Sequence, residues 1–199
     1  MKENQLQFPI KFKFNVATMA NDFTAKDAND QTIAYVRQKM FKMKEDILIY
    51  NNESKEKVNY NIKADKWIDF SAAYSFTDDQ GQELGKVARK GWASIWNAKY
   101  EIIDENREQK FMIREENAWV KVFDSLLGEI PVLSFFTGYL FNPTYKVMDK
   151  GGETVVRLKK EPSFFGRKFE IEKVKDMNED SEKIILSLMM MILLERRRG

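Results

Sequence analysis

The sequence predicts an all-β protein, a closed barrel of about twelve mostly antiparallel strands around a buried hydrophobic C-terminal helix. Two observations support this prediction. A hairpin-like pattern recurs five times along the chain, and the final segment is apolar on every side. No linker rich in Pro, Gly or Ser and no change of composition divides the 199 residues, so we expect residues 1–199 to form a single barrel domain.

The repeat occupies five windows of 17 residues that align without a gap: residues 23–39, 47–63, 74–90, 100–116 and 145–161. Each window has apolar residues at positions 1, 3 and 14, and an Asp or Asn at position 5. Residues two apart share one face of a strand, and Asp and Asn open turns by bonding to the backbone two residues on. Each window is therefore predicted to form one β-hairpin with one buried face.

Two further segments alternate in the same way, residues 10–16 and residues 169–172. With the ten hairpin strands they bring the expected total to twelve. Twelve strands with one apolar face each must hide that face in a sandwich or in a closed barrel. We favour the barrel because closure also removes the exposed strand edges.

The C-terminal helix is predicted over about residues 180–198. Residues 184–194 are apolar apart from Ser187, and Asp180 or Ser181 would serve as its N-cap. A helix that is apolar all round lies in a core or in a membrane. Eleven residues span about 16 Å, roughly half of the hydrocarbon thickness of a bilayer. We therefore expect the helix to fill the barrel lumen.

Composition excludes several classes of function. The chain has no Cys and no His, which removes thiolate nucleophiles, the Ser-His-Asp arrangement and the usual zinc ligands. A formal net charge of +2 argues against a dedicated nucleic-acid binder. We expect a protein that is not an enzyme and that needs no metal and no cofactor. The polar start of the chain lacks the features of a signal peptide, so a cytoplasmic location is expected.

Residues 35–41, residues 74–90 and the closing helix resemble the Tubby C-terminal-like superfamily, which includes the phospholipid scramblases. Within it the chain is most similar to bacterial LURP-one-related proteins. The resemblance implies a twelve-stranded barrel around a central helix. It also implies a link to membranes, since Tubby proteins bind phosphoinositide headgroups and scramblases associate with membranes. No phosphoinositide motif carries over residue by residue, and the palmitoylated Cys-rich segment of scramblases is absent.

The first candidate site is the strongly apolar segment 126–141, which contains Phe135 and Phe136. It would suit a loop that dips into a membrane or binds a partner, because exposed apolar patches mark contacts. The alternative, which we prefer, is an insert packed on the end of the barrel.

The second candidate site is the basic segment 157–168. Its basic residues flank two aromatic ones, in the order Lys159, Lys160, Phe164, Phe165, Arg167 and Lys168. Lysine and arginine would meet anionic headgroups while the rings insert. The preferred alternative is an ordinary hairpin with solvated charges and two core phenylalanines.

Two sets of acidic residues are predicted to be structural. Asp176, Asn178 and Asp180 resemble the start of a calcium loop, but Ser181 and Ser187 stand where Gly and Glu are required, which favours helix capping. The acids that open the hairpins are explained by turn geometry.

Three functions remain in competition. The preferred hypothesis is a non-catalytic binding module for anionic phospholipid headgroups or membrane surfaces, which would place the protein at the membrane periphery. The alternative is a protein-interaction or scaffold domain that uses segment 126–141. A hydrolase with paired carboxylates is the third, and it requires two close carboxyl groups with displaced pKa values.

Overall fold

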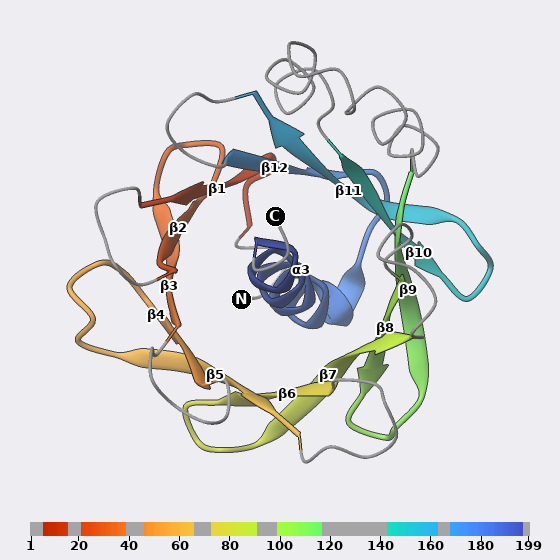
Figure 1. Ribbon diagram of the computed structural model, residues 1–199, viewed down its shortest axis with the longest axis horizontal. Coiled ribbons are helices and arrows are strands. Elements are labelled where there is room, and N and C mark those ends of the chain that lie inside the picture. Colours follow the sequence, from red (N-terminus) through yellow and green to blue (C-terminus); the bar gives the residue numbers. More distant parts are fainter. Residues whose placement is uncertain are drawn as a thin grey trace, which may run out of the picture.

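The fold was determined from a computed structural model that describes residues 6–15, 21–38, 46–65, 73–90, 99–116, 143–162 and 168–196. Within these residues, twelve strands close into a barrel with one long helix in its lumen (Figure 1). Each strand is antiparallel to both of its neighbours. The predicted fold class is therefore confirmed.

The strands follow one another around the barrel in chain order, and β12 closes the ring by pairing with β1. Their bounds are β1 Ile10–Phe14, β2 Phe23–Lys26, β3 Thr32–Gln38, β4 Asp46–Tyr50, β5 Val58–Ala64, β6 Ala73–Asp78, β7 Glu83–Lys90, β8 Lys99–Asp104, β9 Gln109–Glu115, β10 Thr144–Asp149, β11 Thr154–Glu161 and β12 Lys168–Lys173.

Alternation of apolar and polar residues explains the strands. In β1, Ile10, Phe12 and Phe14 are buried, whereas Lys11 and Lys13 are exposed. Successive side chains of a strand point to opposite faces, so one face of each strand lines the lumen and the other meets solvent.

The predicted repeat is confirmed in four of its five windows. In these four, position 1 faces position 14 and position 3 faces position 12, as in the pairs Phe23–Val36 and Ala25–Ala34. All five windows also have a register shift after position 3, which is typical of a β-bulge.

The gap-free alignment was wrong for the second window, where Ile49 pairs with Tyr60. The amide of Asn51 bonds to the carbonyl of Lys57, whereas the equivalent bond in the first window joins Asp27 to Gln31. This turn is therefore two residues longer. An insertion of two residues keeps the same side chains inside, because the strand period is also two, and the hydrophobic pattern could not reveal it.

The longer turn reaches over the outer face of β2 and β3. Thr24 donates a hydrogen bond to Glu53 at 3.1 Å, and the Lys55 ammonium lies 5.0 Å from the centre of the Tyr35 ring. This covering buries Thr24 and Tyr35 although both point outward. Burial, together with the hydrogen bond from its hydroxyl to Asp22, raises the pKa of Tyr35 to about 12.

The other four turns are closed by an aspartate at their first position. Its Oδ1 atom accepts a hydrogen bond of 2.8–2.9 Å from the backbone amide four residues later. These residues are Asp27, Asp78, Asp104 and Asp149. The turn acids have the structural role that the sequence predicted.

The barrel has two distinct ends. We call the end with the five hairpin turns the turn rim, and the opposite end, where the chain leaves β1, β3, β5, β7, β9 and β11, the loop rim. After β12 the chain passes through the 3₁₀ turn η2 (Asn178–Asp180) into the helix α3 (Ser181–Arg196). The helix therefore enters the lumen at the turn rim and runs toward the loop rim.

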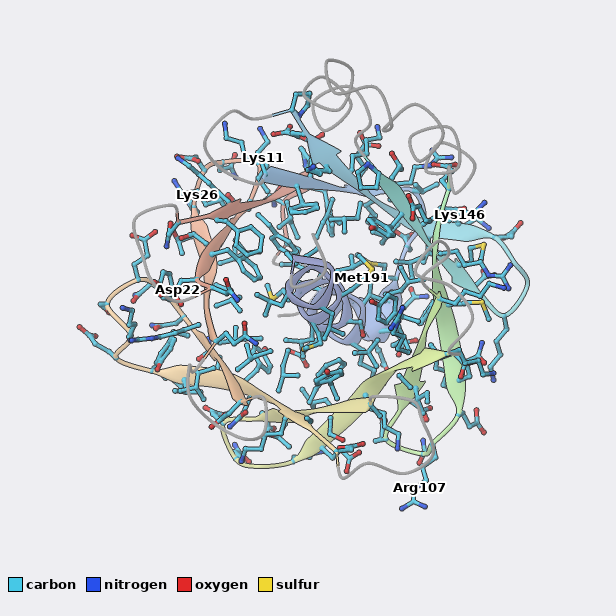
Figure 2. All side chains as sticks on the ribbon, in the orientation of Figure 1. Lys11, Asp22, Lys26, Arg107, Lys146 and Met191 are labelled. Carbon is cyan, nitrogen blue, oxygen red and sulfur yellow. The ribbon has the colours of Figure 1, made fainter. Side chains whose placement is uncertain are left out.

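Helix α3 supplies the centre of the core. The side chains of residues 184–193 are at most 1% exposed, and Met191 lies in the middle of the barrel (Figure 2). The helix lies closest to β6, β7 and β8. Phenylalanines fill the opposite wall, where Phe23 lies with its ring centre 5.2 Å from that of Phe12 and 5.0 Å from that of Phe14.

Polar contacts hold the first turn of α3 at the turn rim. The hydroxyl of Tyr60 donates to Glu182, and burial and this carboxylate raise the pKa of Tyr60, so the phenol keeps its proton. Lys183 forms ion pairs with Glu105 at 2.9 Å and with Asp180 at 3.1 Å. The start of the helix is thus tied to β5 and to the β8–β9 turn.

Gly85 allows β7 and β8 to approach each other, and we predict that Gly85→Ala destabilises the barrel strongly. Gly85 has φ +135°, and a Cβ atom there would lie 2.5 Å from the carbonyl oxygen of Ile103. We expect the free energy of unfolding in urea to fall by about 2–4 kcal/mol. The matched control is Gly152→Ala, with φ +83° but open space around the new atom, which should cost about 1 kcal/mol. Equal losses would show that the close approach is unimportant.

Ser187 is fully buried in the centre of α3, and its hydroxyl has no hydrogen-bond partner among the described residues. We predict that Ser187→Ala raises the free energy of unfolding by about 1 kcal/mol, because it removes an unsatisfied polar group and improves helix propensity. Met191→Ala, which opens a cavity at a similarly buried position, should lower it by about 2–5 kcal/mol. A loss of stability on Ser187→Ala would contradict the assignment.

Candidate functional site

A group of lysines lies on the outer surface where β2, β1 and β12 run side by side. We call Lys11, Lys13, Lys26 and Lys168 the lysine face. Lys11 and Lys26 point away from the barrel on the same side (Figure 2). The strands present these side chains outward because Phe12, in β1, and the residues next to the other lysines point into the core.

Strand register places these lysines directly opposite one another. Lys11 pairs with Lys26 across β1 and β2, and Lys13 pairs with Lys168 across β1 and β12. Like charges at opposed positions of neighbouring strands destabilise a sheet. The lysine face therefore carries a repulsion that a bound anion would relieve.

Carboxylates neutralise some lysines of the lysine face more than others. Lys26 pairs with Asp30 at 2.9 Å, and this hydrogen bond and charge lower the pKa of Asp30. Lys11 lies 4.0 Å from Glu170. Among the residues that the structure describes, Lys13 and Lys168 have no carboxylate within 4 Å. The two lysines nearest the loop rim thus form no ion pair with a described carboxylate, although Glu161 lies opposite Lys168 on β11.

The basic segment proposed from the sequence is divided between two faces of the barrel. Lys168 belongs to the lysine face. Lys159 is exposed on β11 and pairs with Glu172 at 2.7 Å. Lys160 pairs in register with the buried Phe169 and so lies on the inner face, because consecutive residues of a strand alternate. The three lysines therefore do not form one cluster.

The remaining predicted site residues lie outside the described residues. These are Phe164, Phe165, Arg167, Phe135 and Phe136, together with segment 126–141. The described strands do locate where the chain enters and leaves these segments. Glu161 pairs with Lys168 and Glu115 pairs with Tyr145, so both connections begin and end at the loop rim.

Sequence reasoning missed Lys11, Lys13 and Lys26. Alternation in residues 10–14 already indicated that Lys11 and Lys13 share the solvent face of one strand. Their proximity to Lys168 depends on the closing pair of strands, which joins residues far apart in the chain.

A second polar group lies on the inner face at the loop rim. Four inward positions there carry polar side chains, each opposite a buried residue of the neighbouring strand. We call them the loop-rim ring: Gln38, Arg89, Glu115 and Lys160. Gln38 accepts a hydrogen bond from Asn21 at 3.0 Å. The inward side chains of the described strands therefore become polar where the lumen meets the loop rim.

The acids that resemble a calcium loop are engaged in ion pairs. Asp176 pairs with Lys173 at 2.7 Å and Asp180 pairs with Lys183 at 3.1 Å. No group of three or more potential ligand side chains within the described part of the chain is arranged to hold a metal ion.

The charge state of the acids bears on the hydrolase hypothesis. The described carboxyl groups with displaced pKa values all have lowered ones, owing to lysines or backbone amides: Asp30, Asp104, Glu105, Glu108 and Asp176. A general acid requires the opposite displacement. These carboxylates are stabilised as anions and do not form an acid–base pair.

As for membrane spans, the helices in the described ranges are too short or too polar to cross a bilayer.

The described residues thus form a closed twelve-stranded antiparallel barrel that encloses its own C-terminal helix. The model of the LURP-one-related family matches residues 32–129, which run from β3 through β9. The chain belongs to this family, part of the Tubby-like C-terminal and scramblase superfamily, and the resemblance noted in the sequence is confirmed. No curated protein and no solved structure gives a significant match.

Asp104 provides a test of the turn structure by pH. Burial alone would raise its pKa, but the Glu108 amide and the Lys110 ammonium, 3.2 Å away, outweigh burial and lower it. The ionised carboxylate therefore stabilises the fold above its ordinary pKa of 3.8, and this contribution disappears as the pH falls through the lower folded value.

We predict that Asp104→Asn lowers the free energy of unfolding by about 1 kcal/mol at pH 7, because the negative charge beside Lys110 is lost. The loss stays small because the amide oxygen still accepts the turn hydrogen bonds. The difference from the wild type should shrink as the pH falls below 3.8. Urea unfolding at pH 7, 5, 4 and 3 measures it. A difference that stays constant over this range would contradict the assigned charge effect.

Proposed function

We propose that the protein is a non-catalytic binding module whose lysine face docks on anionic phospholipid headgroups at a membrane surface. The observation that supports this most directly is the opposed pair Lys13 and Lys168. Both are exposed, they face each other across two strands, and no described carboxylate lies within 4 Å of either.

The arrangement of charge supports this function better than the total charge does. The net charge is only +2, so the whole molecule has little attraction for anions. A lysine close to an anionic bilayer contributes about 1 kcal/mol. Four lysines on three adjacent strands would thus give a weak, reversible association that falls with rising salt.

The sequence next to Lys168 favours the same surface. Phe164, Phe165 and Arg167 directly precede it, and aromatic side chains beside basic ones suit the headgroup boundary. On this proposal the protein is cytoplasmic and peripheral, because anionic lipids are concentrated in the cytoplasmic leaflet. Membership of the LURP-one-related family is compatible with non-catalytic binding.

Charge reversal at the opposed pair tests the proposal. We expect Lys13→Glu/Lys168→Glu to weaken binding to phosphatidylserine vesicles at least about 30-fold, since two attractive charges become repulsive. Co-sedimentation at two salt concentrations measures the effect, and wild-type binding should fall at the higher salt. Neutral phosphatidylcholine vesicles should not bind either protein.

The matched control is Lys86→Glu/Lys146→Glu, which changes the net charge equally at outward lysines of β7 and β10. Lys146 points away from the barrel on a different side (Figure 2). This control should bind almost as the wild type does. Equal weakening of both double variants would mean that general charge, and not the lysine face, drives binding. Failure of the wild type to bind any vesicle would overturn the proposal and favour a protein partner.

A further inference from the structure

Arg89 lies at the inner mouth of the barrel on the side away from the lysine face. It pairs in register with Tyr100, which is fully buried, so its side chain belongs to the inner face of β7. The next residue, Lys90, is exposed on the outer face and pairs with Glu101 at 2.5 Å. The acid on the neighbouring strand is therefore already engaged, on the opposite side of the sheet.

Within the described part of the chain, the guanidinium of Arg89 lacks an acceptor. Its Nε atom is buried without a hydrogen-bond partner among these residues, and none of their carboxylates lies within 4 Å of the side chain. Arginine keeps its charge at any physiological pH and offers five N–H donors in a planar fork. A buried donor without an acceptor costs about 1–3 kcal/mol, which a bound acceptor would recover.

A second donor lies on the neighbouring strand, since Tyr74 pairs in register with Val87, two residues before Arg89 on the same inner face. Tyr74 is an inward residue of β6, its side chain is 6% exposed, and its hydroxyl forms no hydrogen bond to another described residue. Burial raises the pKa of Tyr74 more than the positive charge of Arg89 lowers it. The phenol therefore stays protonated and available as a donor.

We propose that Arg89 and the hydroxyl of Tyr74 form a binding site for one oxyanion, a phosphate group, inside the mouth of the barrel at the loop rim. A guanidinium fork matches two oxygens of a phosphate, and the phenol supplies a third donor. Within the loop-rim ring, Lys160 adds positive charge, whereas Glu115 opposes it. The phosphate is either a free inorganic ion or the phosphomonoester group of a lipid headgroup.

This site is independent of the lysine face. Arg89 points inward from β7, and the lysines point outward from β1, β2 and β12, across the barrel. The competing explanation is that Arg89 balances the negative end of α3, which packs against β6, β7 and β8 and ends toward the same rim. That explanation requires no ligand.

Titration of the wild-type protein with inorganic phosphate at constant ionic strength tests the site. Binding should shift amide resonances of β6 and β7, and this readout needs no variant. In calorimetry, Arg89→Gln should bind phosphate at least about tenfold more weakly, and Tyr74→Phe about fivefold more weakly. Arg114→Gln, an equal charge change on β9 opposite Lys99 and Lys146, should bind as the wild type does.

Lys13→Glu/Lys168→Glu should retain phosphate binding, so failure of this site and failure of the lysine face are distinguishable. Glycerol 3-phosphate distinguishes the two sources of the phosphate group: tighter binding than inorganic phosphate indicates a headgroup, and weaker binding indicates the free ion. The proposal is overturned if phosphate shifts no amide of β6 or β7. It is also overturned if Arg89→Gln and Arg114→Gln weaken phosphate binding equally.

Discussion

The rest of the structure depends on the burial of α3 by the barrel that surrounds it. A twelve-stranded barrel leaves space that its own inward side chains do not fill. A helix that is apolar all round has no stable place in water. Each element removes the instability of the other, and the off-centre helix leaves a remaining gap that the phenylalanines of β1, β2 and β12 occupy. The outward side chains are therefore not needed to fill the core, and their positions can carry charged residues.

The contrast between an apolar inner face and a charged outer face explains where the candidate binding residues lie. Among the described residues, the inward positions of the strands are mainly apolar along the lumen, and polar inward residues gather at the ends, as with Tyr60 at the turn rim and Arg89 at the loop rim. On the outside, alternation repeats every second residue, and strands from distant parts of the chain place their lysines in register. The lysine face and the Arg89 site both arise because successive side chains of a strand point alternately outward and inward, and closure of the sheet brings distant strands together.

The barrel and its helix could be predicted because both have local signals. Hairpin turns are specified by an aspartate and its neighbours, and the helix by eleven almost wholly apolar residues. The candidate site was harder to predict, because Lys13 and Lys168 meet only through closure of the sheet. The two extra residues before Lys57 were equally hidden, since they preserve the pattern of buried positions. Arg89 gave no signal because a single arginine in a strand is ordinary.

The closing pair of strands also sets the order of assembly. Every other neighbouring pair joins strands that follow each other in the chain, whereas β1 and β12 join Ile10 to Ile171. Pairings that span most of the chain form slowly, because the entropy of the long loop is lost first. Closure of this seam completes the wall around the helix. The β1–β12 pairing is therefore expected to be the last strand pairing to form. The lysine face lies on the strands that make this pairing.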